Sequence, residues 1–181
     1  MTDIPKNISR TATVLLIVAC SFTTGTQAAS LSFTTTPVDN NTWEIDYTAG
    51  NDTLGVPLEE FVILFEPGLY TNLVATATPL NWDPLTIQPD PFTPDNGFYD
   101  ALALADGIAP GASLGGFTVQ FDFLGSGKPG AQPFQVIDPF TFDILEQGVT
   151  SPQTVPLPPA LWLFAGGLSG LIGCCSVKKR T

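Results

Sequence analysis

Carboxylates are the side chains of this chain with the widest choice of chemistry. The sequence has 17 Asp and Glu residues and no His. Calcium prefers oxygen ligands. Four aspartates in and beside one Pro-rich stretch are candidate calcium ligands: Asp83, Asp90, Asp95 and Asp100. No EF-hand or nonapeptide spacing accompanies them, and Asp-Pro pairs such as Asp83-Pro84, Asp90-Pro91 and Asp138-Pro139 are also ordinary turn initiators. We expect no cofactor, with calcium as the one possible bound ion.

Catalysis has few candidate residues. Glu59, Glu60 and Glu66 flank one apolar run, an arrangement that two-carboxylate hydrolysis can use. The alternative is that Glu59 and Glu60 are charged residues at the start of a strand and that Glu66 is a solvated turn residue. Without His, and with every Cys outside the central part, no Ser/His/Asp or Cys/His arrangement and no His-bound zinc is available there. We expect a protein that is not an enzyme.

Aromatic side chains give the second binding hypothesis. Trp82, Phe98 and Tyr99 lie in or beside predicted loops, and exposed aromatic rings can stack on sugars. The alternative is that they pack beneath a long loop. Trp43 is excluded as a glycan contact, because it alternates in register with Ile45 and Tyr47 and is therefore expected on the buried face of the same strand.

The elements that would position these residues are strands. Residues 117–123 and 43–48 alternate apolar and polar side chains, which predicts strands with one buried face. Phe61–Phe65 is apolar throughout and predicts a strand buried on both faces. Five further strands are predicted at Leu31–Thr35, Leu73–Thr78, Tyr99–Leu104, Phe134–Ile137 and Thr141–Leu145.

Turn residues punctuate these runs, among them Pro67-Gly68 and Pro129-Gly130. Four prolines between Asn81 and Gly97 predict a long exposed loop. The pattern predicts an all-β domain over residues 29–154, a single immunoglobulin-like or jelly-roll-like β-sandwich of seven or eight strands, with one C-terminal transmembrane helix outside it.

This central domain is strongly acidic. Lys128 is its one basic residue, and all acids except Asp3 belong to it, so 16 acids and one base give about −15. Such a surface repels nucleic acid and anionic lipid and attracts cations. Cys20, Cys174 and Cys175 lie in the terminal apolar segments, so the domain must fold without disulfides.

The N-terminus predicts a signal peptide over residues 1–28. Lys6 and Arg10 precede a short apolar run, and Thr26-Gln27-Ala28 suits signal peptidase. Cleavage is expected after Ala28. Residues 17–20 also fit a lipobox, in which Cys20 would be lipidated, although Cys20 also fits as a small member of the apolar run.

The C-terminus predicts a membrane anchor. Residues 160–177 are 18 residues without a charge, roughly 27 Å as a helix, which is close to the hydrocarbon thickness of a bilayer. The basic residues after this transmembrane helix, Lys178, Lys179 and Arg180, act as a membrane stop that keeps the C-terminus cytoplasmic.

The tail from residue 155 to 181 resembles the PEP-CTERM sorting signal in its Val-Pro-Leu-Pro variant. The resemblance is carried by Val155, Pro156, Leu157 and Pro158, by the Gly-rich apolar segment and by the basic end; Leu157 stands where the commonest form has Glu. It implies a Gram-negative bacterium that makes extracellular polysaccharide, and cleavage near the Pro motif by the membrane enzyme exosortase.

We therefore expect an exported protein, anchored in the inner membrane as a precursor and delivered to the cell surface or biofilm matrix after processing. The first hypothesis is a structural component associated with exopolysaccharide. The alternative is a glycan- or calcium-dependent binding module of the adhesin or lectin type.

Overall fold

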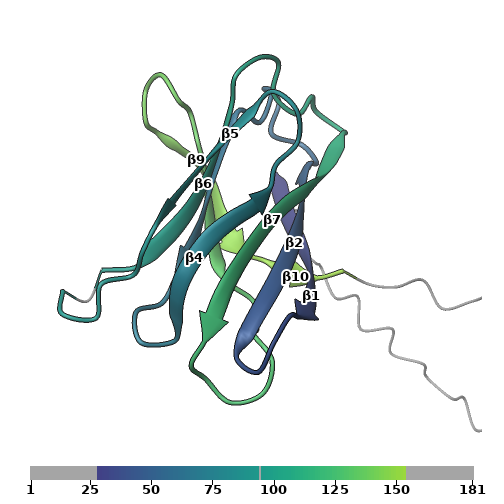
Figure 1. Cartoon of the computed structure of the whole chain (residues 1–181). Coiled ribbons are helices and arrows are strands. Elements are labelled where there is room, and N and C mark those ends of the chain that lie inside the picture. Colours follow the sequence, from purple (N-terminus) through teal and green to yellow (C-terminus); the bar gives the residue numbers. More distant parts are fainter. Residues whose placement is uncertain (1–27, 94, 154–181) are drawn as a thin grey trace, which may run out of the picture.

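The computed structural model describes residues 28–93 and 95–153, which form two five-stranded sheets without a helix. Sheet I has the order β10-β1-β2-β7-β4 and sheet II the order β5-β6-β3-β8-β9. Figure 1 shows the two sheets as layers that face each other. Sheet I contains β1 (Ala29–Pro37), β2 (Thr42–Asn51), β4 (Tyr70–Ala77), β7 (Ser113–Phe123) and β10 (Ser151–Pro152). Sheet II contains β3 (Glu60–Phe65), β5 (Trp82–Ile87), β6 (Gly97–Ala103), β8 (Pro133–Ile137) and β9 (Ile144–Val149).

Alternation in the sequence determines which side chains enter the core. In β7, Phe117, Val119 and Phe121 are fully buried, as the period-two pattern predicts. They pair with the inward residues of β2 in antiparallel register, for example Val119 with Ile45. The register shifts where Gly116, at φ 95°, is inserted between two paired residues, and glycine suits such a bulge because it has no Cβ.

Aromatic side chains join the two sheets. Phe61 of β3 meets Phe117 of β7 edge to face, with ring centroids 4.9 Å apart. Phe65 and Tyr70 are packed in the same way at 5.2 Å. Burial of each such ring contributes about 1.5–3 kcal/mol, so the two inner faces together stabilise the sandwich. An all-β sandwich is thus confirmed.

A buried amide supports this core. Gln132 accepts a hydrogen bond from the Tyr47 hydroxyl at 3.1 Å and donates one to the Tyr70 hydroxyl at 3.3 Å. Thr150 also donates to Gln132, at 3.2 Å. These bonds satisfy polar groups inside the sandwich and fix the segment that leads into β8.

The strand count differs from the prediction. The described residues form ten strands, not seven or eight. β5 lies inside the stretch predicted as a loop, so that loop shrinks to residues 88–96; Pro84 is tolerated because β5 is an edge strand. β9 begins at Ile144, because residues 138–143 form a turn where a strand was predicted from Thr141. The finer immunoglobulin-like or jelly-roll-like class stays a prediction.

Two hairpins of sheet II have the same turn chemistry. Asp90 follows β5 and Asp138 follows β8, each in the sequence Asp-Pro-Phe-Thr. Each aspartate accepts a hydrogen bond at 2.8 Å from the backbone N–H of the phenylalanine two residues later. These bonds lower the pKa of both carboxyls. The turn-initiating role of these two Asp-Pro pairs is confirmed, whereas Asp83-Pro84 lies within a strand.

The terminal predictions lie outside the described residues. They comprise the signal peptide except Ala28, the sorting motif, the transmembrane helix and the basic end. Within residues 28–93 and 95–153, no helix has the length and apolar character needed to cross a membrane.

Candidate functional site

The outer face of sheet II carries apolar side chains that no second layer of the described residues covers completely. Antiparallel pairing places Val62 of β3 and Leu85 of β5 on either side of Asp100 of β6. Side chains of paired residues share one face of a sheet. We call this surface the Asp100 face, and it comprises Glu60, Val62, Leu64, Asp83, Leu85, Ile87, Phe98, Asp100, Leu102, Pro133, Gln135 and Ile137.

This face corrects the prediction for β3. Phe61, Ile63 and Phe65 are buried between the sheets, but Val62 and Leu64 are only half-buried on the outside. Leu85 and Ile87 are 50% and 44% exposed. The apolar run of β3 is therefore not buried on both faces in the described domain. Apolar residues gathered on an exposed surface commonly mark a binding site.

Asp100 lies in the middle of the apolar residues. Its Oδ1 atom is buried and has no hydrogen-bond partner among the described residues. Burial raises the pKa of Asp100 to about 6, and the nearby carboxylates of Glu60 and Asp83 raise it as well. Burial also raises the pKa of Glu60. Glu60 and Asp83 both pair with Leu102, two residues from Asp100 on β6. The three acids therefore lie near one another, while Lys128, the one basic residue among those described, lines a different depression.

A depression continues the face at one end of β3. It has a volume of about 440 Å³ and is lined by Leu64, Glu66, Pro67, Asn96 and Pro133. A neighbouring hollow of about 310 Å³ shares Leu64 and Pro133 and extends towards β9. The surface thus runs from the acidic residues of β5, β6 and β3 to a shallow, partly apolar groove.

Of the three aromatic residues predicted to contact glycans, only Phe98 is accessible on an outer face. Trp82 and Tyr99 are 7% and 0% exposed, and both pack on Phe61 with ring centroids 6.0 and 6.3 Å away. Trp82 belongs to the core because the stretch predicted as a loop forms β5, and Tyr99 belongs to it because it is an inward residue of β6. The predicted role of Trp82 and Tyr99 as exposed contacts is wrong for this arrangement. Phe98, half-buried, does lie on the Asp100 face.

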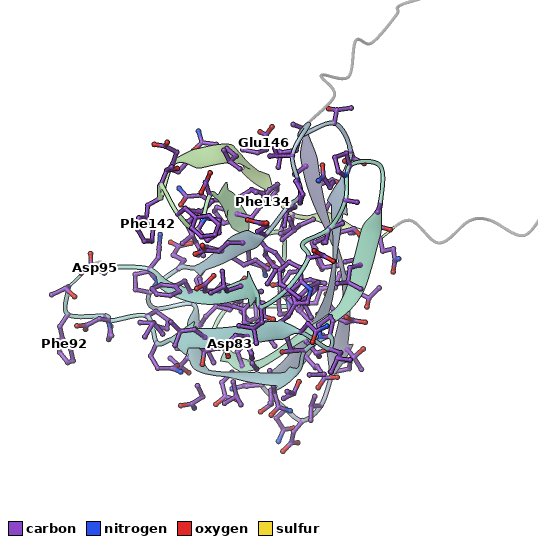
Figure 2. The ribbon with its side chains drawn as sticks, turned by 90° about the horizontal axis from the view of Figure 1, so that it is seen from above. Asp83, Phe92, Asp95, Phe134, Phe142 and Glu146 are labelled. Atoms are coloured by element: carbon purple, nitrogen blue, oxygen red, sulfur yellow. The ribbon has the colours of Figure 1, made fainter. Side chains whose placement is uncertain are left out.

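The four predicted calcium ligands fall into two places. Asp90 and Asp95 lie in the β5–β6 hairpin loop, where their backbones form an isolated bridge. Figure 2 shows Asp95 on a projecting loop and Asp83 apart from it, against the body. Asp83 and Asp100 belong to the Asp100 face. Among the described residues no group of three or more His, Cys, Asp or Glu side chains could hold a metal ion. Calcium binding stays a prediction.

The glutamates considered for two-carboxylate hydrolysis also lie apart in the structure. Glu60 points to the outer face from the start of β3, whereas Glu66 is exposed in the turn after that strand. The sequence pattern did not predict Val62, Leu64, Leu85 or Ile87 as residues of an outer sheet face. The alternation of Leu85 and Ile87 with Thr86 was the available signal, and the four surrounding prolines concealed it.

The chain matches no protein-family model and no curated protein sequence. The chitin-binding domain of Chi18aC from Streptomyces coelicolor has a TM-score of 0.37 and 19% identity, over 59% of this chain and 90% of that one. A GH20 exo-β-N-acetylglucosaminidase from Vibrio harveyi, solved with N-acetylglucosamine, has a TM-score of 0.36 and 8% identity, over 72% of this chain and 19% of that one. Overlaps of this extent transfer no ligand or activity to this chain.

Proposed function

We propose that this chain is an exported, non-enzymatic protein of the cell surface or extracellular matrix that binds polysaccharide through the Asp100 face. In this proposal the domain adds a non-covalent contact to exopolysaccharide, as a structural component of a biofilm would require. Calcium is not needed for the contact, because the face offers apolar and carboxylate groups directly.

The supporting observation is the uncovered apolar surface of sheet II. Leu85, Ile87 and Phe98 are neighbours on β5 and β6 and lie beside polar groups. Sugar rings likewise combine an apolar C–H face with hydroxyls. Carboxylates such as Asp83 can accept hydrogen bonds from those hydroxyls.

The terminal segments support export and processing. A signal peptide ending at Ala28 would be removed by signal peptidase, and the tail from Val155 would be recognised by exosortase while the apolar segment holds the precursor in the inner membrane. Gln153 is the last described residue, so the expected cleavage region follows the folded domain directly.

A glycan array tests the binding function. Residues 28–153 contain both sheets and the whole described core, so this domain is a suitable probe. We expect binding to at least one polysaccharide class, equal with calcium or chelator. Leu85→Ser should weaken it about tenfold, whereas Val74→Ser, at an equally exposed position of sheet I, should not. Absence of binding, or equal loss in both variants, would refute the proposed face.

Mass spectrometry of the surface-associated protein tests the processing. The mature chain should begin near Ala29 and lack Lys178–Arg180. Replacement of both Pro156 and Pro158 by Ala should leave uncut precursor in the inner membrane. A surface form that retains the basic end would mean that the tail is a permanent anchor.

A further inference from the structure

Glu146 is an acidic side chain on the inner side of the sandwich. It pairs with Val136 of β8, which is fully buried, and side chains of paired residues share one face of a sheet. β9 is the edge strand of sheet II and lies close to β1 of sheet I, so this half-buried carboxylate is at the rim where the two sheets meet. A carboxylate in such a place needs donors, and a cation is the partner that stabilises it most.

The donors to Glu146 in the described structure are neutral. Oε2 accepts a hydrogen bond from the Ala28 N–H at 3.1 Å, and Oε1 accepts one from the Gln147 N–H, also at 3.1 Å. Lys128, the one basic residue among those described, lines a depression beside Pro152. Figure 2 shows Glu146 next to the start of β1, where Ala28 enters the fold. A cation delivered to this position would therefore have a carboxylate ready to bind it.

We propose that the α-ammonium group created by removal of the signal peptide pairs with Glu146 and links the start of β1 to β9. This inference rests on the export and processing proposed above and assigns a binding site to the new N-terminus. Cleavage after Ala28 leaves the amine on Ala29, and successive backbone nitrogens are at most about 3.6 Å apart. The Glu146 carboxylate already reaches the Ala28 nitrogen, and its rotatable side chain can follow the shortened chain end.

The fold also orders the events. Ala29 is fully buried, and the Ala28 carbonyl accepts a hydrogen bond from the Thr53 N–H at 2.8 Å. The peptide bond between Ala28 and Ala29 therefore belongs to the folded domain, whereas proteases cut backbone that is exposed and free of such bonds. Cleavage must precede the docking of β1, so the amine is present when the domain folds. In an uncut chain, the docked Ala28 gives Glu146 only a neutral donor.

The charges around the start of β1 favour an amine there. β1, β8 and β10 contain no charged residue, and Glu146 is the one charged residue of β9. Asp52 directly follows β2, whose last residue Asn51 pairs with Ala29. The acids within β2 pair with the far half of β1: Glu44 and Asp46. An ammonium group at Ala29 thus has Glu146 and Asp52 as its charged neighbours, and both are acidic.

A double-mutant cycle in thermal unfolding tests the pairing. One chain, residues 29–153, is released from a cleavable fusion so that it begins at Ala29. The other, residues 25–153, retains Ala28 and moves the amine back to Gly25. At about pH 6.5 and low salt, Glu146→Gln should lower the Tm of the shorter chain by about 2–4 °C more than that of the longer one.

A matched control uses another glutamate. Glu66 is exposed in the turn after β3. Glu66→Gln removes the same charge at a site away from the chain start, so it should change the Tm of both chains equally. Circular dichroism at low temperature confirms that every variant folds.

The pH dependence separates an ion pair from a purely structural role of Glu146. Pairing raises the pKa of the α-amino group above its ordinary value of about 7.7–8.0. The extra stability is therefore complete below that value and is lost as pH rises through the raised pKa. The difference between the two chains should persist from about pH 6 to about pH 8 and disappear by about pH 10. NMR titration of Ala29, with Glu146→Gln as reference, measures the raised pKa directly.

Two results would overturn the inference. The first is an equal effect of Glu146→Gln in both chains at every pH, which would mean that Glu146 only protects the edge of β9 from pairing with other strands. The second is an α-amino pKa that Glu146→Gln leaves unchanged. A surface form whose N-terminus precedes Gly25 would instead reject the processing on which the inference rests, even where the isolated chain shows the pairing.

Discussion

The outer faces of the two sheets differ in chemical character. Sheet I presents hydroxyl, amide and carboxylate groups, and its residues make up what we call the Asp122 face: Ser32, Thr34, Thr36, Glu44, Asp46, Thr48, Thr118, Gln120 and Asp122. The Asp100 face of sheet II is mostly aliphatic. Antiparallel sheets commonly have one face on the core and one in water, and the Asp122 face follows that pattern. The Asp100 face departs from that pattern, and this difference is the reason for placing the proposed binding function there.

One aspartate on each face shows the same difference. Asp122 accepts hydrogen bonds from the Thr42 hydroxyl and from the Asn72 amide, both at 2.7 Å, and these bonds lower its pKa. Asp100 has an unpartnered oxygen, and burial raises its pKa to about 6. Sequence position in a strand does not distinguish the two residues. What distinguishes them is whether the neighbouring strands supply donors.

The largest effect should come from the inner side of sheet II. Phe61 is fully buried and contacts Trp82, Tyr99 and Phe117, so Phe61→Ala should leave a cavity and lower the free energy of unfolding by about 3–5 kcal/mol. Phe98→Ala, on the outer side of the next strand, should cost less than about 1.5 kcal/mol. Urea denaturation of both variants checks this; equal losses would mean that the Asp100 face is a second core.

A smaller effect of opposite sign is expected at Asp100. The folded-state pKa exceeds that of an unfolded aspartate, so the ionised group destabilises the fold progressively as pH rises from about 4 to about 6, and the loss stays constant above that. Asp100→Asn should therefore stabilise the domain by about 1 kcal/mol at pH 7, after allowance for solvent screening of a partly exposed group. At pH near 4 the gain should vanish. Thermal unfolding at the two pH values measures it, and a loss of stability at pH 7 would contradict the unpaired state of Asp100.

The smallest effect is expected at Asp122. Its lowered pKa means that the carboxylate contributes stability above the unfolded pKa and loses this contribution as pH falls through the folded value. Asp122→Asn should cost at most about 0.5 kcal/mol at pH 7, because the site is open to solvent. The sign, opposite to that of Asp100→Asn in the same assay, is the informative result.

Period-two patterns predicted most of the sheets. Seven of the expected strands overlap observed ones closely, because residues such as Val119 and Ile45 must alternate into one core. β5 was missed, because Pro84 and three further prolines favour a loop when the chain is considered locally. Because β5 is an edge strand of sheet II, a proline in it need not interrupt the hydrogen bonding between strands. Whether a strand lies at an edge depends on partners that are distant in the sequence.

The candidate site was less predictable for the same reason. Trp82 looked exposed because its segment looked like a loop, and Tyr99 looked exposed because it adjoins that segment. The orientation of a ring in a strand follows from its pairing register. Val62 and Leu64 looked buried because an apolar run implies a layer on each side. Only the three-dimensional arrangement shows that sheet II has one covering layer among the described residues.

The short strand β10 has a mechanical consequence. It lies parallel to β1, and the last bond of the described chain runs from the Gln153 N–H to the Phe33 carbonyl at 2.8 Å. A pull on the chain beyond Gln153 loads this pair first, and residues 151–153 would peel away and release about 10 Å of slack. The load would then reach Thr150, which is held in the buried network of Gln132. Residues 151–153 would therefore detach under such a pull while the Asp100 face remains folded.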